Sequence, residues 1–164
     1  MADLFLGFDI GTTAIKGALF DAGGVLVAHA SRPYPTARPA PGIVEQDPRD
    51  WVHGLLAVME MLAAEGRAER IASVGLCGQV NTDVFVDAEG QALAPAIGWA
   101  DSRAAGDAAA LDAAISVQDR MTWWGAPLPV GASHVLARMA WMARQRPEVY
   151  AATAHVLKIG RAHV

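Results

Sequence analysis

The chain has 164 residues, of which 53% are hydrophobic and 18% are charged, and its formal net charge is -4. This length can enclose a sizeable core, the composition excludes a disordered chain, and the acidic balance argues against a nucleic-acid-binding surface. Because no apolar run reaches the length of a membrane span and no basic signal-peptide region opens the chain, a cytoplasmic location is expected.

The first predicted element is a β-hairpin. An apolar run over residues 4–6 leads into Asp9, Gly11-Thr12-Thr13 forms a tight turn, and residues 15–21 form the second strand. Backbone N–H groups in such a turn suit a phosphate, and an acid at a strand end suits hydrated Mg²⁺. The order Asp-x-Gly-Thr-Thr-x-x-Lys, which ends at Lys16, favours a nucleotide-phosphate site. The alternative is a hairpin in which Asp9 only caps the turn.

A third strand and a helix follow the hairpin. Residues 25–30 come after a Gly-Gly turn and complete an antiparallel meander, whereas residues 31–42 contain four prolines and are predicted to be extended and irregular. Asp47 then caps a helix that ends at Gly66. The buried face of this helix is predicted from residues at helical spacing, namely Trp51, Leu55, Val58, Met59 and Leu62.

Two strands after this helix complete the predicted core. The small apolar residues 71–77 indicate a central strand covered on both faces, and Cys77, the only cysteine, is interpreted as a small buried hydrophobe. Residues 83–87 form a further strand. The β-β-β-α-β order predicts an α/β protein of the ribonuclease H-like class. No Gly-x-Gly-x-x-Gly and no Walker motif occurs, so the two commonest nucleotide-binding folds lack their signatures.

The rest of the chain is predicted to be largely helical, over residues 102–116, 133–145 and 147–153. In the second of these helices the apolar residues at helical spacing, Leu136, Met139, Ala140 and Ala143, are expected to share one face. Three tryptophans without polar company in the sequence are interpreted as packing residues, namely Trp123, Trp124 and Trp141.

The loop over residues 78–83 is the first of two polar clusters. It follows the predicted central strand, and ligands of open α/β sheets bind at strand ends. The amides of Gln79 and Asn81 carry donors and acceptors that can read sugar hydroxyls. The alternative is that these groups only satisfy the backbone of a local turn.

The second polar cluster spans residues 97–103. The face of Trp99 can pack on the C–H face of a sugar, and Asp101 can accept a hydrogen bond from a hydroxyl. The alternative is a core Trp99 and an Asp101–Arg103 pair that caps the next helix, and for this segment alone it is the simpler interpretation.

Taken together, these motifs resemble the N-terminal domain of the FGGY carbohydrate kinases over residues 4–158. Their order and spacing are more specific than any single motif. The matching segments are Gly7 to Lys16, Glu45-Gln46-Asp47-Pro48 before Trp51, Gly78-Gln79, Trp99 to Arg103, and Trp141 through Tyr150. The resemblance implies an actin-like ATPase fold and ATP-dependent phosphorylation of a sugar or polyol hydroxyl. Actin and Hsp70 proteins share a similar hairpin, but the Trp-x-Asp-x-Arg segment is not expected in them.

The resemblance also implies roles for individual residues. The hairpin would face the phosphates of ATP, with Asp9 organising Mg²⁺ and with Gly11, Thr12, Thr13 and Lys16 close to the transferred phosphoryl group. The sugar pocket would be bordered by Gln79, Val80, Asn81, Trp99 and Asp101. Xylulose kinases carry Met-His, and glycerol kinases Arg-Glu, where this chain has Val80-Asn81, so the identity of the sugar stays open.

The resemblance further implies a longer parent protein. Family members have a second domain that binds adenosine and a catalytic Asp later in the first domain, and no residue here matches that Asp. Residues 1–158 are therefore predicted to be part of an FGGY N-terminal domain that is inactive alone. Residues 159–164 resemble one reading frame of a sequencing adapter and are predicted to be a non-native tail.

Two other functions stay open beside the kinase. One is a non-catalytic module that binds a sugar without turnover, and the other is a different actin-like ATPase. A sugar or polyol is the expected partner, a homodimer of the full-length protein is the assembly considered, and neither nucleic acid nor a membrane is expected to bind.

Overall fold

The computed structural model describes residues 3–159 and divides the chain into two compact units. The first unit includes residues 3–36 and 46–80, and the second includes Ala37–Glu45 and Asn81–Leu157. No helix within residues 3–159 has the length and apolar character that a membrane crossing requires. Of the predicted non-native tail, residues 160–164 lie outside the described residues.

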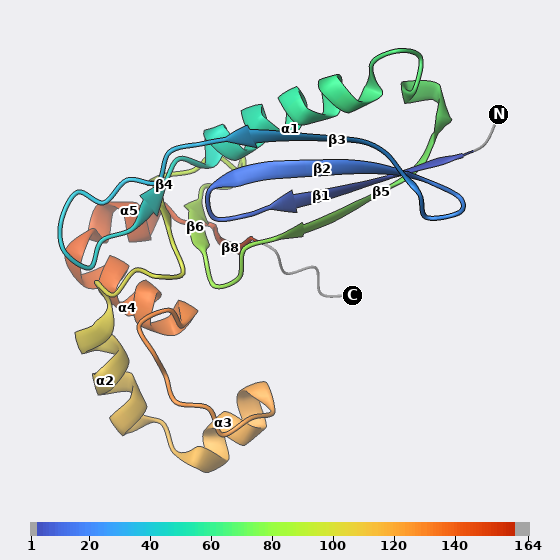
Figure 1. The fold of residues 1–164 in the computed structure, drawn as a ribbon. Helices are drawn as coiled ribbons and strands as arrows, with labels where there is room; N and C mark the ends of the chain where they lie inside the picture. Colours follow the sequence, from blue (N-terminus) through green and yellow to red (C-terminus); the bar gives the residue numbers. More distant parts are fainter. Residues whose placement is uncertain (1–2, 160–164) are drawn as a thin grey trace. The chain divides into compact units, whose positions relative to one another are not determined.

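The first unit is built on a four-stranded sheet. It contains β1 (Leu4–Ile10), β2 (Ala14–Asp21), β3 (Leu26–Pro33) and β5 (Ile71–Gly78), in the spatial order β3-β2-β1-β5 (Figure 1). The first three strands form the antiparallel meander, and β5 pairs with β1 in parallel. The long helix α1 (Pro48–Ala63) precedes β5, with the 3-10 turn η1 (Ala68–Arg70) between them. The predicted β-β-β-α-β order is therefore confirmed.

Helix α1 packs closely on β2. A Cβ added to Gly17 would lie 2.6 Å from Val58 Cγ1, and one added to Gly54 would lie 2.9 Å from Ile15 Cγ1, so both contacts depend on glycine. Asp47 caps the helix as predicted, because its carboxylate accepts a hydrogen bond from Arg49 N. Burial of a side chain such as Val58 stabilises the fold by about 1.5–3 kcal/mol.

Three expectations for the first unit are wrong. Met59 is 37% exposed, and the helix instead buries Gly54. The proline-rich segment is regular at its start, since β3 continues to Pro33 on the edge of the sheet, where a strand tolerates a missing N–H. Strand β5 is an edge strand, not a central one, and residues 72–77, including Cys77, are exposed.

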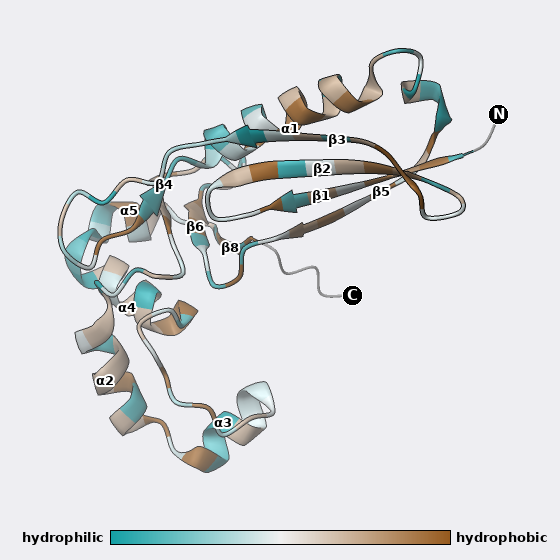
Figure 2. Ribbon diagram, viewed as in Figure 1, coloured by the Kyte–Doolittle hydropathy of each residue, from teal (hydrophilic) through white to brown (hydrophobic). Residues whose placement is uncertain are grey.

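Strand β5 is nevertheless strongly apolar, as Figure 2 shows. The helix α1 contacts β1, β2 and β3, and β5 has a paired neighbour on one side only. The apolar composition of β5 correctly indicates a strand, but its burial depends on neighbouring elements that a strand's own sequence does not specify.

The second unit contains most of a smaller sheet and four helices. The sheet has the order β4-β7-β6-β8, from β4 (Glu45–Gln46), β7 (Ala96–Ile97), β6 (Asp83–Val86) and β8 (His155–Lys158). The helices are α2 (Ala105–Ala114), α3 (Val117–Trp124), α4 (Val135–Gln145) and α5 (Pro147–Ala152). Two apolar clusters form its core, one around Phe85, Ile97, Met142 and Val149 and the other around Ala104, Ala108, Val130 and Ala137.

Sequence reasoning missed α3, although its start carries a capping signal. Ser116 Oγ accepts a hydrogen bond from Asp119 N, which is the Ser-x-x-acid pattern of a helix N-terminus, and Gly125 ends the helix in the left-handed conformation. Trp123 is not a core residue, since it is 61% exposed, but its ring packs edge-to-face on Trp124 with 6.0 Å between the ring centroids. Trp124 and Trp141 do pack against the apolar clusters.

The buried face of α4 also differs from the prediction. The helix buries Ala137, Arg138 and Met142, and Arg138 is completely inaccessible to solvent. A charged side chain at a helical position is normally assigned to the solvent face, so the predicted face is rotated away from the observed one.

Candidate functional site

The first unit presents Asp9 and Lys16 side by side across the hairpin. These two residues are direct partners in the antiparallel register of β1 and β2, at the end of the hairpin that carries the Gly11-Thr12-Thr13 turn. Gly11 N donates to Ala14 O and closes the turn at 3.1 Å. A Cβ on Gly11 would lie 3.4 Å from Asp9 Oδ2, so glycine leaves the carboxylate uncrowded.

The carbonyl groups of the turn accept hydrogen bonds from other residues of the first unit. The Tyr34 hydroxyl donates to Gly11 O, and Tyr34 N donates to Thr13 O at 3.2 Å. Thr12 O accepts from Thr36 Oγ1 at 3.3 Å and from Gln46 Nε2 at 2.7 Å. Every carbonyl of the turn thus has a protein donor, and these contacts immobilise a backbone loop predicted to receive phosphate.

Sequence reasoning did not assign roles to Tyr34, Thr36 or Gln46. Two of them lie at or beside the proline-rich segment that was expected to be irregular, and the third was noted only as part of a matching motif. Burial, and next the charge of Asp9, raise the pKa of Tyr34 to about 12. The hydroxyl therefore remains a donor to the turn at any ordinary pH.

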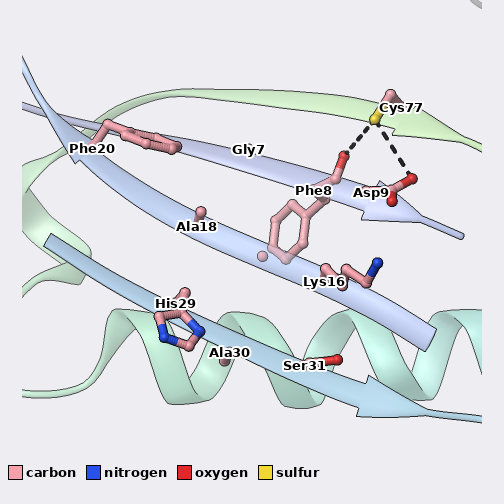
Figure 3. A pocket seen from close by; sticks show the side chains of 11 residues that line it. Gly7, Phe8, Asp9, Lys16, Ala18, Phe20, His29, Ala30, Ser31 and Cys77 are labelled. Atoms are coloured by element: carbon pink, nitrogen blue, oxygen red, sulfur yellow. Dashed lines mark hydrogen bonds between the residues drawn. The ribbon is translucent and has the colours of Figure 1, made fainter. Parts of the chain in front are cut away.

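A shallow hollow of about 470 Å³ lies on the sheet face that points away from α1. Figure 3 shows Asp9 and Lys16 at one end of it and the apolar side chains of Ala18 and Phe20 towards the other. Cys77 lies beside Asp9, and its single S–H proton faces two acceptors, Phe8 O at 3.3 Å and Asp9 Oδ1 at 3.7 Å from Sγ. Partial desolvation and the neighbouring carboxylate raise the pKa of Cys77, so the thiol stays protonated near neutral pH.

The chemistry of this end of the sheet fits a phosphate-bound magnesium ion. Within residues 3–159 no group of three or more His, Cys, Asp or Glu side chains could hold a metal by itself. Magnesium is commonly bound by one or two carboxylates while substrate phosphates and waters supply the remaining ligands. Asp9 next to an immobilised turn is consistent with that arrangement.

Gln79 connects to the hairpin. Its backbone N–H donates to Ile10 O at 2.9 Å, and its side chain, only 8% exposed, donates through Nε2 to Gln46 Oε1 at 2.6 Å. Gln79 Oε1 is buried and accepts no hydrogen bond within the part of the chain that the structure describes. An unsatisfied buried acceptor costs about 1–3 kcal/mol, so this oxygen suits a ligand hydroxyl or a bridging water. Val80, the next residue, is 65% exposed.

Asn81 and the segment before Trp99 share a buried arginine in the second unit. Arg138 Nη1 donates to Asn81 O at 2.7 Å and to Asp83 Oδ2 at 2.6 Å, and Nη2 donates to Gly98 O at 2.6 Å. The Arg138 and Asp83 side chains are both completely buried. Asn81 has a φ of 51°, in the left-handed region that asparagine tolerates better than most non-glycine residues.

Asp101 is buried and its carboxylate is occupied by protein donors. Oδ2 accepts from Val44 N at 2.6 Å and from Arg103 at 2.8 Å, while Oδ1 accepts from Arg103 N and Nε, each at 2.9 Å. Burial opposes ionisation, but the hydrogen bonds from Arg103 and from Val44 N outweigh it and hold the pKa of Asp101 below its ordinary value. Trp99, by contrast, is 51% exposed, so it is not a core residue.

Arg103 extends this cluster in two directions. It forms an ion pair with Glu45 at 2.9 Å, and its guanidinium lies over the ring of Trp141 at 5.1 Å from the ring centroid. Trp141 therefore contacts a charged group, the Arg103 guanidinium, which its neighbours in the sequence did not indicate.

The predicted site residues thus divide between the two units. Asp9, Gly11, Thr12, Thr13, Lys16, Gln79 and Val80 belong to the first unit, and Asn81, Trp99 and Asp101 belong to the second. Within the first unit the structure joins the turn to Gln79 through Gln46, and within the second it joins Asn81 to Gly98 through Arg138.

A family model described as the N-terminal domain of the FGGY family of carbohydrate kinases matches residues 4–161. The chain belongs to this family. Among solved structures, the xylulose kinases of Brucella ovis and Rhodospirillum rubrum match with TM-scores of 0.85 each, at 30% and 31% identity and over 94% and 93% of the chain. These FGGY neighbours confirm the ribonuclease H-like, actin-like ATPase fold.

Sequence relatives in this family carry several substrate names. The chain is 28% identical over 147 residues to a xylulose kinase of Escherichia coli and 35% identical over 153 residues to a glycerol kinase of Gloeobacter violaceus. The two alignments include 90% and 88% of this chain. They include only 30% and 29% of the two relatives, so the chain spans less than a third of their length.

Proposed function

We propose that this chain forms the phosphate-hairpin and sugar-binding part of an ATP-dependent kinase that phosphorylates a sugar or polyol. In that reaction a substrate hydroxyl oxygen forms a bond to the γ-phosphorus of ATP, the bond from that phosphorus to the β,γ-bridging oxygen breaks, and the hydroxyl proton is taken up by a base. No residue of this chain is assigned as that base. The observation that carries the proposal is the Asp9–Lys16 pair beside a turn whose carbonyls are all held by protein donors.

Each residue of the hairpin has a proposed task. Asp9 would hold Mg²⁺, which when bound neutralises phosphate charge, and Lys16 would add a positive charge close to the same phosphates. In the turn of Gly11, Thr12 and Thr13, the Gly11 N–H is engaged with Ala14 O, and the backbone N–H groups of Thr12 and Thr13 would receive the phosphoryl oxygens. Because the carbonyls of the turn are already held by protein donors, the turn backbone needs little reorganisation when charge develops during transfer.

The sugar-binding residues are proposed in both units. Gln79 has a buried acceptor suited to a hydroxyl, and Val80, which follows it, is exposed. In the second unit Asn81 and the half-exposed Trp99 are proposed to contact substrate. The carboxylate of Asp101 is already engaged, so we propose that it serves the substrate by holding the segment that carries Trp99.

The proposal also covers the setting of the enzyme. A cytoplasmic location and a homodimer of the full-length protein are proposed, and the family membership favours a sugar or polyol as the bound small molecule. The chain alone is proposed to be inactive, because neither a base nor an adenosine-binding region is recognised in it.

Steady-state kinetics of a full-length kinase that contains this chain test the proposal. ADP formation is expected only when a suitable sugar or polyol is present, and the isolated 164-residue chain is expected to form none. Trp99→Ala is expected to raise the KM for the sugar while leaving the KM for ATP near its parent value. Sugar-independent ATP hydrolysis would instead support a different actin-like ATPase, and sugar binding without turnover would support a binding module.

A further inference from the structure

We infer that Gln46 is a positioning residue that links the Gly11-Thr12-Thr13 turn to the side-chain amide of Gln79. The predicted phosphate-binding turn and the predicted sugar-binding Gln79 are therefore not independent of each other. This inference rests on the proposed function. Gln46 is 3% exposed, and its side-chain amide is engaged by the protein itself, through Thr12 and Thr36 on one side and Gln79 on the other.

The direction of the hydrogen bonds in this chain follows from chemistry. A backbone carbonyl can only accept, so Gln46 must present its NH2 group to Thr12 O, at 2.7 Å. Gln46 Oε1 is then left to face Gln79 and can only accept, so Gln79 must present its own NH2 group, at 2.6 Å. The turn carbonyl thereby determines which end of the Gln79 amide is the donor and which is the acceptor.

The consequence is a defined polarity at Gln79. With its nitrogen committed to Gln46, Gln79 keeps its oxygen as the group without a partner in residues 3–159. Such an oxygen accepts from a hydroxyl donor, and it selects a ligand that can donate. If the Gln46 contact were lost, the Gln79 amide could rotate and this selectivity would be lost with it.

Few side chains could replace Gln46. Leucine would remove the contacts to Thr12, Thr36 and Gln79. The Thr12 carbonyl would keep the Thr36 hydroxyl as a donor, whereas the buried Nε2 of Gln79 would lose its acceptor, at a cost of about 1–3 kcal/mol. Glutamate would still accept from Gln79 Nε2 but could not donate to Thr12 O. Thr36 provides a comparison inside the same network, because its hydroxyl donates to Thr12 O and accepts from Gln46 Nε2 without touching Gln79.

Three variants of a full-length kinase containing this chain separate these contacts. Gln46→Leu is expected to raise the KM for both sugar and ATP by about fivefold or more, whereas Gln46→Glu is expected to raise the KM for ATP while keeping the KM for sugar near the parent value. Thr36→Val, the matched control, is expected to change the KM for sugar by less than about twofold. Loss of folded protein would lower kcat for all substrates equally and would not produce this split.

A second measurement does not depend on activity. In ¹⁵N spectra of the protein, Gln46→Leu is expected to shift the Gln79 side-chain amide and the Thr12 and Thr13 backbone amides together, and Thr36→Val only the backbone amides. A folded Gln46→Leu with an unshifted Gln79 amide and unchanged KM values would overturn the inference. If the parent enzyme shows no sugar-dependent ADP formation, the proposed function fails, and the spectra still decide the role of Gln46.

Discussion

The two units hold their predicted ligand-binding segments by different physical means. In the first, neutral groups do so: a tyrosine and a threonine hydroxyl and two amides hold the turn and Gln79. In the second, buried charges do so: Arg138 with Asp83 holds Asn81 and Gly98, and Asp101 with Arg103 holds the segment after Trp99. Neutral contacts specify direction at low cost, whereas a buried ion pair contributes most through the penalty for breaking it.

If charge is essential in the second unit, Arg138→Gln should have the largest effect on stability. The substitution leaves Asp83 buried without its counter-ion, and breaking a buried pair costs about 3–5 kcal/mol. Urea unfolding would measure this loss. Arg144→Gln on the same helix is the control, because Arg144 is 58% exposed in its pair with Asp107 and such pairs contribute about 1 kcal/mol at most. Equal effects of the two variants would show that burial of Arg138 is unimportant.

Asp9→Asn should affect chemistry and spare the fold. Asp9 lies at the rim of the hollow and not in the core, so its loss should spare the fold. If the metal that Asp9 holds stabilises the transition state by about 3 kcal/mol, loss of that stabilisation lowers turnover about a hundredfold. Turnover of a full-length kinase containing this chain, measured beside its thermal unfolding, checks both halves of the statement. Near-parent turnover in Asp9→Asn would remove the metal role from this residue.

The charged cluster around Asp101 should make the free energy of unfolding depend on pH in the acidic range. Its folded pKa is below the ordinary value, so its contribution is present above the unfolded pKa and is lost as the pH falls through the folded pKa. Asp101→Asn is expected to cost about 2 kcal/mol near neutral pH, and the difference from the parent should shrink below about pH 4. Urea unfolding at several pH values measures it. A difference that stays constant down to pH 2 would mean that the charge of Asp101 contributes nothing.

Tyr34→Phe should cause the smallest loss in the free energy of unfolding, and this loss should not change with pH near neutrality. The variant removes the donor to Gly11 O, at a cost of about 1 kcal/mol. The folded pKa of Tyr34 is raised to about 12, so its contribution is fully present below the unfolded pKa and is lost only as the pH rises through the folded value. The same unfolding series should show a constant difference between pH 5 and pH 9. A pH-dependent difference in that range would contradict a contact made by an uncharged hydroxyl.

Local patterns were sufficient for the elements of the first unit. The Gly-Thr-Thr turn, the Asp47 cap and the α1 spacing each depend on residues close together in the chain, and each is observed, except that Met59 of the predicted α1 face is exposed. The same is true of the missed helix α3, whose Ser116 cap was available as a local signal. Burial was not local: β5 is as apolar as a central strand, but residues 72–77 are exposed because they lie on an edge.

By itself the sequence determined the β-β-β-α-β order, the family and the position of the hairpin turn, because these follow from short-range pattern and motif spacing. Only the tertiary structure decided which polar groups hold them. Gln46 meets Thr12 and Gln79 from 34 and 33 positions away in the chain, and Arg138 meets Asp83 from 55. Periodicity places a lone arginine in solvent, since it cannot include a counter-ion that arrives from another element. The fold supplies that counter-ion, and with it the reason that the charge can be buried.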